Sequence, residues 1–226
     1  AGAAGVACSK MYKALGAKQV IIVDSKGVIN QERKGLDASK QELIAQTSDK
    51  SLEDAMRGAD MVLGLSKAGI ITENMVASMN ANPIIFACAN PIPEILPEEV
   101  AKIRNDAIMG TGRSDYPNQI NNVLGFPFIF RGALDVRASK ITENMKLAAA
   151  KALADLAKEP VSENIKKIYE RTTMEFGREY IIPAPFDKRV FVWVSAAVAK
   201  AAVEDGVANV ENFDVEKYKQ ELEARI

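Results

Sequence analysis

The start of the chain and an acidic residue further on form the first group that could do chemistry. The sequence AGAAG, residues 1–5, matches the last five positions of a G-x-G-x-x-G turn, and a helix-like stretch follows it. An apolar run then ends at Asp24, close to the offset of roughly 20 residues at which dinucleotide-binding units place their ribose ligand. Small residues such as Gly2 and Gly5 let the backbone approach a pyrophosphate, and the helix start offers free N–H groups. The pattern predicts a dinucleotide site whose first glycine and preceding strand lie before residue 1.

Two alternatives accompany this interpretation. Turns of small residues are common, so residues 1–5 could form one without a ligand, and Asp24 could be a turn residue in Asp-Ser-Lys-Gly. Ser25 and Lys26 follow the ribose position and could bind the 2′-phosphate of NADP, whereas an Asp at the end of the strand favours NAD. Lys26 could equally be a solvated turn residue. The choice between NAD and NADP therefore stays open.

A second group of candidate residues follows later apolar runs. Gly64 and Ser66 stand in GLSKAG, where the carboxyl end of a parallel strand would face the ligand crevice near the adenosine or diphosphate. Asn90 comes directly after another run, and Pro91 and Pro93 restrict its loop. Its carboxamide could offer donors to a carboxylate and to a nicotinamide. The alternatives are a strand-to-helix loop without a ligand and an Asn that caps a turn.

A third candidate is the stretch TGRSDYPNQINNVLGFPFIFRGALDV, residues 111–136, which combines a long polar loop with a segment rich in Phe. It contains the adjacent pair Asn121 and Asn122. A polar loop that leads into a buried helix would have the same composition. Composition alone does not decide between this alternative and a ligand site.

The elements that must position these residues alternate along the first half of the chain. Short runs rich in Val, Ile, Leu and Met predict strands buried on both faces, as in a parallel sheet covered by helices. The expected strands are 20–24, 61–65, 84–88 and 107–111, and the expected helices are 37–46, 51–58, 72–80 and 97–104. The tetrapeptide TENM begins at Thr72 and again at Thr142, which predicts a Thr N-cap in both places.

Beyond residue 123 the pattern is helical almost throughout. Expected helices cover 146–159, 164–177, 187–205 and 214–225, and YIIPAPFDKR connects two of them. The sequence predicts an α/β fold with a doubly wound, mostly parallel sheet, helices on both faces and a helical C-terminal extension. We expect a dinucleotide-binding domain over residues 1–160, with its first strand missing, and the extension over 161–226 packed on the same domain.

Composition excludes several other functions. The formal net charge is −1, from 29 basic and 30 acidic residues, and no basic cluster is interleaved with aromatic residues, so we expect no nucleic-acid or membrane partner. The chain contains no histidine, which excludes an imidazole base, a His-dependent zinc site and a His-containing triad. Cys8 and Cys88 are expected to be buried apolar side chains in a reducing cytoplasm or organelle matrix.

Four of these stretches together resemble the C-terminal half of the bacterial malic enzymes. They are VDSKG (23–27), ANPIPEI (89–95), the stretch 111–136 and YIIPAPFD (180–187). The resemblance implies oxidative decarboxylation of L-malate to pyruvate and CO2, with reduction of NAD or NADP and help from Mg2+ or Mn2+. It implies that Asn90 and Asn122 contact substrate close to the nicotinamide, with Asn121 an uncertain neighbour. The residues expected to bind the cofactor are Gly2, Ala3, Ala4, Gly5, Asp24, Ser25, Lys26, Gly64, Ser66, Asn90 and Asn122.

Other parts of the family pattern have no match in this chain. In the family, the tyrosine and lysine that move protons, the arginine that holds malate and the acidic metal ligands precede the dinucleotide loop. The resemblance therefore implies no catalytic residue and no metal ligand here, an inactive chain without its N-terminal half, and a homodimer or higher oligomer. We also expect that residues 1–226 do not persist as an isolated fold. The alternative functions are another hydroxy-acid dehydrogenase, with a Lys or Asp base, and a non-catalytic dinucleotide-sensing module.

Overall fold

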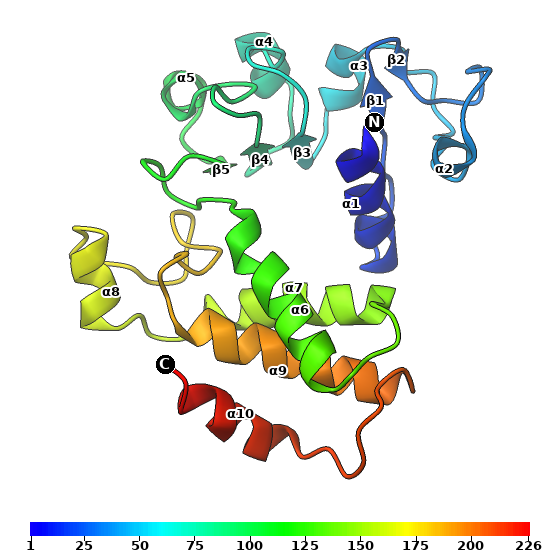
Figure 1. Ribbon diagram of the computed structural model, residues 1–226. Helices are drawn as coiled ribbons and strands as arrows, with labels where there is room; N and C mark the ends of the chain where they lie inside the picture. Colours follow the sequence, from blue (N-terminus) through cyan, green and yellow to red (C-terminus); the bar gives the residue numbers. More distant parts are fainter. The chain divides into compact units, whose positions relative to one another are not determined.

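Three of the expected strands form one parallel sheet in the computed structural model, which describes residues 1–226 (Figure 1). The strands β3 (Met61–Gly64), β4 (Ile84–Ala87) and β5 (Ile108–Thr111) lie in the order β3-β4-β5. The register pairs Gly64 with Ala87 and Ala87 with Thr111, so all three strands end at one edge of the sheet. The predicted α/β class and parallel sheet are therefore confirmed.

Helices connect these strands, as the alternating pattern predicts. Before the sheet comes α3 (Leu52–Met56), and the crossovers contain α4 (Glu73–Ala77) and α5 (Pro97–Ile103). Their apolar side chains pack with the sheet in one cluster. Its buried members are Met56, Ile71, Val76, Met79, Ile85, Ala87, Ile95 and Val100. Because the crossovers are short and well packed, the loops that leave β3 and β4 start from fixed positions.

The apolar run at 20–24 differs from the expectation, since it does not join the parallel sheet. Only β1 (Val23–Asp24) is a strand, and it pairs antiparallel with β2 (Gly27–Val28) in a separate two-stranded sheet. The reversal rests on Gly27, whose φ of 105° is accessible to glycine and whose absent Cβ would lie 2.3 Å from the Lys50 carbonyl oxygen. An apolar run predicts burial but not the direction of its partner strand.

Two expected helices are shorter than predicted. The segment expected at 37–46 contains only α2 (Ala38–Gln41), which Asp37 caps. The segment expected at 164–177 contains α8 (Glu163–Ile168) and then leaves the helix, with Glu170 at a φ of 53°. Both Thr caps are confirmed: Thr72 Oγ1 accepts from the Met75 amide at 3.4 Å, and Thr142 Oγ1 from the Met145 amide at 3.1 Å.

The chain divides into two compact units, Ala1–Tyr116 and Pro117–Ile226. The second unit is helical, as expected. The boundary expected at residue 160 falls inside it, between two helices, and stays a prediction. No helix in either unit has both the length and the apolar character needed to cross a membrane.

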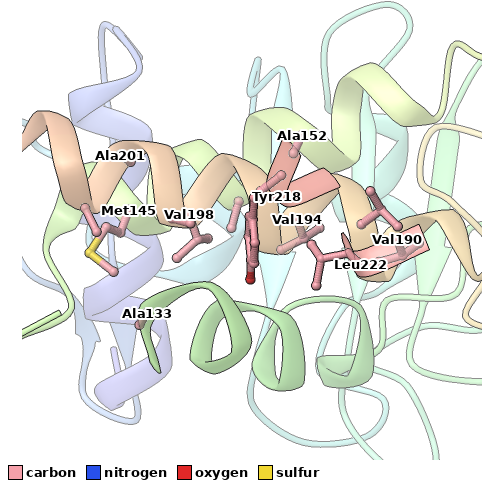
Figure 2. Close-up of a cluster of buried hydrophobic side chains, with 14 of the residues drawn as sticks. Ala133, Met145, Ala152, Val190, Val194, Val198, Ala201, Tyr218 and Leu222 are labelled. Atoms are coloured by element: carbon pink, nitrogen blue, oxygen red, sulfur yellow. The ribbon is translucent and has the colours of Figure 1, made fainter. Parts of the chain in front are cut away.

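A long helix organises the second unit. The helix α9 (Arg189–Glu204) packs against α6 (Phe126–Asp135), α7 (Glu143–Leu156) and α10 (Val215–Glu223). Figure 2 shows side chains of all four helices meeting in this core. The small buried residues on α9 allow close approach, and at Gly132 of α6 an added Cβ would lie 2.4 Å from the Ser195 carbonyl oxygen. This core positions the short 3-10 helix η1 (Asn122–Leu124), which precedes α6.

Candidate functional site

The glycine turn caps the first helix. Gly2 is the N-cap of α1 (Ala3–Ala14), so the amides of Ala3, Ala4 and Gly5 lie in the helix start, and no acidic residue stands in this first turn. Gly2, Ala3 and Ala4 are exposed. A Cβ added at Gly2 or Gly5 would meet no atom within 4 Å. A helix start with free N–H groups and no acidic residue in its first turn has the polarity that a pyrophosphate needs.

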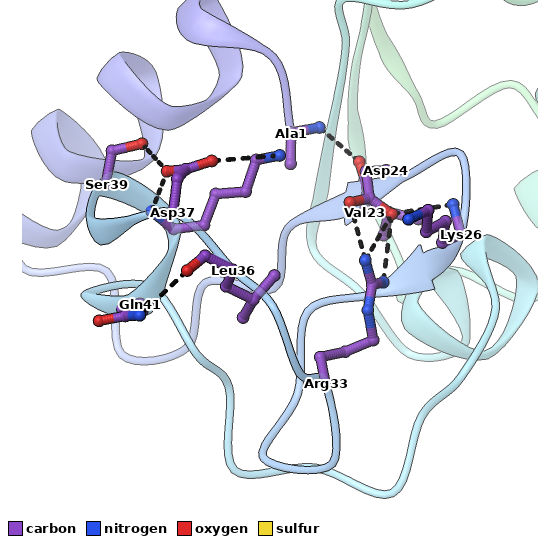
Figure 3. A network of polar contacts seen from close by, with 10 residues as sticks. Ala1, Val23, Asp24, Lys26, Arg33, Leu36, Asp37, Ser39 and Gln41 are labelled. Carbon is purple, nitrogen blue, oxygen red and sulfur yellow. Dashed lines mark hydrogen bonds and ion pairs between the residues drawn. The ribbon is translucent and has the colours of Figure 1, made fainter.

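Asp24 lies at the end of β1 in a network of charged hydrogen bonds (Figure 3). Arg33 donates three hydrogen bonds to its carboxylate, at 3.1, 3.1 and 2.9 Å, and the Lys26 amide donates another at 2.9 Å. The same guanidinium also reaches the carbonyl oxygens of Gly27 and Val28. The hydrogen bonds from Arg33 are the main cause that lowers the pKa of Asp24. Asp24 is therefore an ionised carboxylate whose charge Arg33 balances.

The start of α1 and the strand β1, at whose end Asp24 lies, are neighbours in the first unit. The amino group of Ala1 donates a hydrogen bond to the Val23 carbonyl oxygen, which joins the start of α1 to β1 (Figure 3). The side chains of Ser25 and Lys26 are exposed in the turn beyond Asp24. Sequence reasoning missed Arg33. Its signal was weak, because it is one of 29 basic residues and only the folded hairpin brings it to Asp24.

The loops that follow β3 and β4 meet on a carboxylate that sequence reasoning also missed. Glu94 is fully buried, and it accepts hydrogen bonds from the Ser66 amide at 2.7 Å and from the Ala89 amide at 2.9 Å. Asn90 is exposed directly beside this second bond, and its peptide bond to Pro91 is cis. Gly64 and Asn90 are thus held at the same edge of the sheet by a shared partner.

The pair Asn121 and Asn122 separates into two roles. Asn121 is the N-cap of η1, and its side chain accepts a hydrogen bond from the Val123 amide at 3.0 Å. Asn122 begins η1 and is exposed. Nearby Asn118 is buried and bonds to the carbonyl oxygen of Arg178 and the amide of Ile181, which ties this loop to YIIPAPFD. Asn121 therefore supports the loop, and Asn122 is the amide that is presented. Asn122 lies in the second unit and Asn90 in the first.

Cys8 and Cys88 are both half-buried, and not buried as expected. Burial raises the pKa of the Cys8 thiol and is the main cause that raises the pKa of Cys88 to about 11, so both are neutral at pH 7. Neutral thiols are poor nucleophiles and poor metal ligands. No three His, Cys, Asp or Glu side chains are grouped so that they could hold a metal ion.

The helix start beside Asp24 and the polar loops at one end of a parallel sheet place this chain among the α/β proteins that bind dinucleotides. Comparison with known families defines the group further. The family described as malic enzyme, NAD binding domain, matches residues 4–172, and the chain belongs to the malic enzyme family.

Individual relatives agree with this assignment. An NADP-dependent malic enzyme of Rhizobium meliloti is 54% identical over 228 residues, which cover all of this chain and 30% of that protein. An NAD-dependent malic enzyme of the same organism is 46% identical, over 95% of this chain and 28% of that protein. The crystal structure of Entamoeba histolytica malic enzyme superposes with a TM-score of 0.87 at 34% identity, over 99% of this chain and 46% of that one. The chain thus spans less than half the length of these relatives.

Proposed function

We propose that this chain supplies the NAD(P) site and part of the malate site of an enzyme that oxidatively decarboxylates L-malate to pyruvate and CO2. The observation that carries the proposal is the pairing of an open helix start with Asp24 in one unit of a malic enzyme family member. The exposed amides of Asn90 and Asn122 extend it from cofactor to substrate.

Each group has a distinct role in this proposal. The amides at the start of α1 bind the pyrophosphate, and the pair Asp24–Arg33 faces the adenosine ribose. The dinucleotide, when bound, accepts a hydride from malate. Asn90 in the first unit and Asn122 in the second each supply a neutral amide donor for the substrate or the nicotinamide, and neutral donors neither attract nor repel the transferred hydride.

Proton transfer and metal binding are assigned to other residues of the enzyme. This chain has no histidine, and its structure groups no metal-ligating side chains. We therefore propose that the proton-transfer tyrosine and lysine, and the ligands of Mg2+ or Mn2+, come from the part of malic enzymes that this chain does not span. The chain by itself is then expected to bind dinucleotide weakly at best and not to turn over malate.

Substitution of the two amides tests the proposal. In the complete enzyme, Asn90→Ala or Asn122→Ala should raise the malate requirement or lower turnover by roughly 10- to 1000-fold, as for loss of a positioning group or a transition-state donor. Asn164→Ala on α8 changes an exposed amide of the same type and should leave the kinetics unchanged.

Two results would contradict the proposal, and product analysis separates them. Formation of oxaloacetate without CO2 would identify a simple hydroxy-acid dehydrogenase. Binding of NAD(H) without turnover, in a protein that also contains the remaining malic enzyme domains, would identify a sensing module. In that second case neither amide substitution should change the function.

Cofactor choice follows from the balance of charge near Asp24. Arg33 neutralises the carboxylate, and Lys26 adds a positive charge in the same turn. A 2′-phosphate would therefore meet a region that is not negative overall, and we propose that NADP is accepted. Parallel titrations of the complete enzyme with NADPH and NADH, followed by nucleotide fluorescence, test this. Binding of NADH alone would contradict it.

A further inference from the structure

Glu94 stands out because it is a carboxylate with no exposed surface, which lies in the loop after β4 and joins that loop to the loop after β3. Oε1 accepts from the Ser66 amide, in the loop after β3, and Oε2 accepts from the Ala89 amide, in the loop after β4. The main chain repeats the connection, since the Glu94 carbonyl oxygen accepts from the Ile71 amide at 3.2 Å. One residue therefore binds both loops through side chain and backbone.

This carboxylate is bound by backbone amides, and the ion pairs of the chain involve other acidic residues. A buried carboxyl group without a cationic partner is weak evidence for a role in stability. An apolar side chain, however, cannot accept the hydrogen bonds from the Ser66 and Ala89 amides. The geometry thus favours a role in holding the loops over a role in stability.

Gly64 shows that the space for this carboxylate is built into the sheet. A Cβ added at Gly64 would lie 2.5 Å from Cδ of Glu94 and 2.8 Å from each of its oxygens. Gly64 has no positive φ that would require glycine on conformational grounds. Its missing side chain instead makes room for Glu94 at the end of β3.

We propose that Glu94 is a positioning residue, which fixes the spacing between the Gly64–Ser66 loop and the Asn90 loop so that dinucleotide and malate are held in register. The inference rests on the proposed function, because it concerns the same site. Glu94 touches neither ligand in this account. It acts through the amides of Ser66 and Ala89, the second of which adjoins Asn90.

The chemistry of the side chain makes Glu94→Gln an informative substitution. Glutamine keeps the size of the side chain but has only one acceptor oxygen, and its NH2 group would face one of the two backbone N–H groups. One loop is then released. Gly64→Ala disturbs the same contact from the opposite side, since the new methyl group overlaps the carboxylate. The two variants should therefore have the same effect.

The test is steady-state kinetics in the complete enzyme, with dinucleotide and malate varied separately. For each variant we expect the KM of both substrates to rise about tenfold and kcat to fall roughly 10- to 100-fold, as for misplacement by about 1 Å. The double variant should lose less than the product of the single effects, because both disturb one contact. Glu73→Gln, at an exposed carboxylate in the first turn of α4, is the matched control and should leave both KM values unchanged.

Three outcomes are distinguishable. Unchanged KM values, with only a lower melting temperature or a smaller active fraction, would give Glu94 a merely structural role and overturn the inference. If neither variant folds, hydrogen exchange on the wild-type protein decides: slow exchange of the Ser66 amide in its exposed loop supports the bridge, and free exchange refutes it. A wild-type enzyme that exchanges slowly at Ser66 but forms no CO2 from malate refutes the proposed function instead.

Discussion

Arg33 balances the charge of Asp24, the residue that we propose faces the ribose. Arg33 donates three hydrogen bonds to Asp24 and two to carbonyl oxygens of the β1–β2 hairpin. The same side chain therefore neutralises the carboxylate and holds the hairpin in shape. Both side chains are mostly buried, with exposed fractions of 19% for Arg33 and 17% for Asp24. An ion pair of this kind is screened less by salt than a pair at the surface.

Arg33→Met should therefore change stability and cofactor choice together. We expect a loss of about 1–3 kcal/mol in the free energy of unfolding, because Asp24 loses its partner. The bare carboxylate should also repel a 2′-phosphate, so the dissociation constant of NADPH should rise at least about tenfold more than that of NADH. Urea unfolding and fluorescence titration measure the two effects.

Arg57→Met is the matched control for this prediction. Arg57 is well exposed and pairs with Asp54 at 3.9 Å, so its loss should change neither property measurably. Equal weakening of NADH and NADPH binding by Arg33→Met would show that Arg33 acts only on the hairpin, and would contradict the charge argument.

Residues that act locally were predictable, and residues that act across the chain were not. The Thr caps follow from four adjacent positions, and Asp24 follows from its distance along the chain. Glu94 contacts Ser66, which is 28 residues away, and nothing in ANPIPEI distinguishes its carboxylate from the other acidic residues. Asn121 and Asn122 are neighbours of the same type, so only the start of η1 shows which of them is the cap.

The helix pair α6 and α9 shows how an element depends on one missing side chain. At Gly132 an added Cβ would lie 2.4 Å from the Ser195 carbonyl oxygen and 2.9 Å from Cβ of Val198. Alanine usually stabilises a helix interior relative to glycine by about 1 kcal/mol. In α6 the steric conflict should outweigh this propensity, because two backbones already touch.

Gly132→Ala should therefore destabilise the second unit by about 1–3 kcal/mol, as for overpacking of a filled core. The single tryptophan, Trp193 on α9, reports this unit in a urea titration. Gly177→Ala is the control: Gly177 is exposed in the same unit, its added Cβ would lie 3.8 Å from the Glu175 carbonyl oxygen, an ordinary contact, and the change should stay within about 0.5 kcal/mol. A stabilised Gly132→Ala variant would mean that α6 is not held against α9.

The strands of the parallel sheet were predicted correctly and the pairing of the run at 20–24 was not, for a physical reason. The runs that became β3, β4 and β5 are buried in a sheet, and burial is what an apolar run encodes. The run at 20–24 is equally apolar, but its pairing depends on the positive φ of Gly27 and on the Lys50 carbonyl oxygen that a Cβ would strike. The direction of strand pairing and the ends of helices depend on such tertiary contacts. The hydrophobicity pattern of the sequence does not reveal these contacts.

At the scale of the whole molecule, the absence of histidine shapes the dependence of stability on pH. Histidine is the side chain whose ordinary pKa lies between about pH 5 and 8, so we expect little change in stability over that interval. On the alkaline side, burial raises the pKa of Cys88 to about 11 and that of Tyr12 to about 12, while Cys8 is raised as well. All three groups belong to the first unit.

The sign of the alkaline effect follows from these raised values. An unfolded thiol ionises near pH 8.5, whereas folded Cys88 keeps its proton to about pH 11. The fold therefore has its full stability below about pH 8.5 and loses it progressively up to about pH 11. Urea midpoints from circular dichroism should be level from about pH 6 to 8 and fall by pH 10. Cys88→Ala should flatten the fall, and an unchanged slope would contradict this assignment.

The contact between Gly64 and Glu94 has a consequence for how this sequence can change over generations. A side chain at position 64 is admissible only if position 94 gives up its carboxylate, and a shorter residue at 94 leaves a void beside Gly64. Positions 64 and 94 are therefore expected to covary among related sequences. A substitution at one position should be selected against unless the other position changes as well. A change at both positions would have to pass through a single-substitution variant that is less fit than the original sequence.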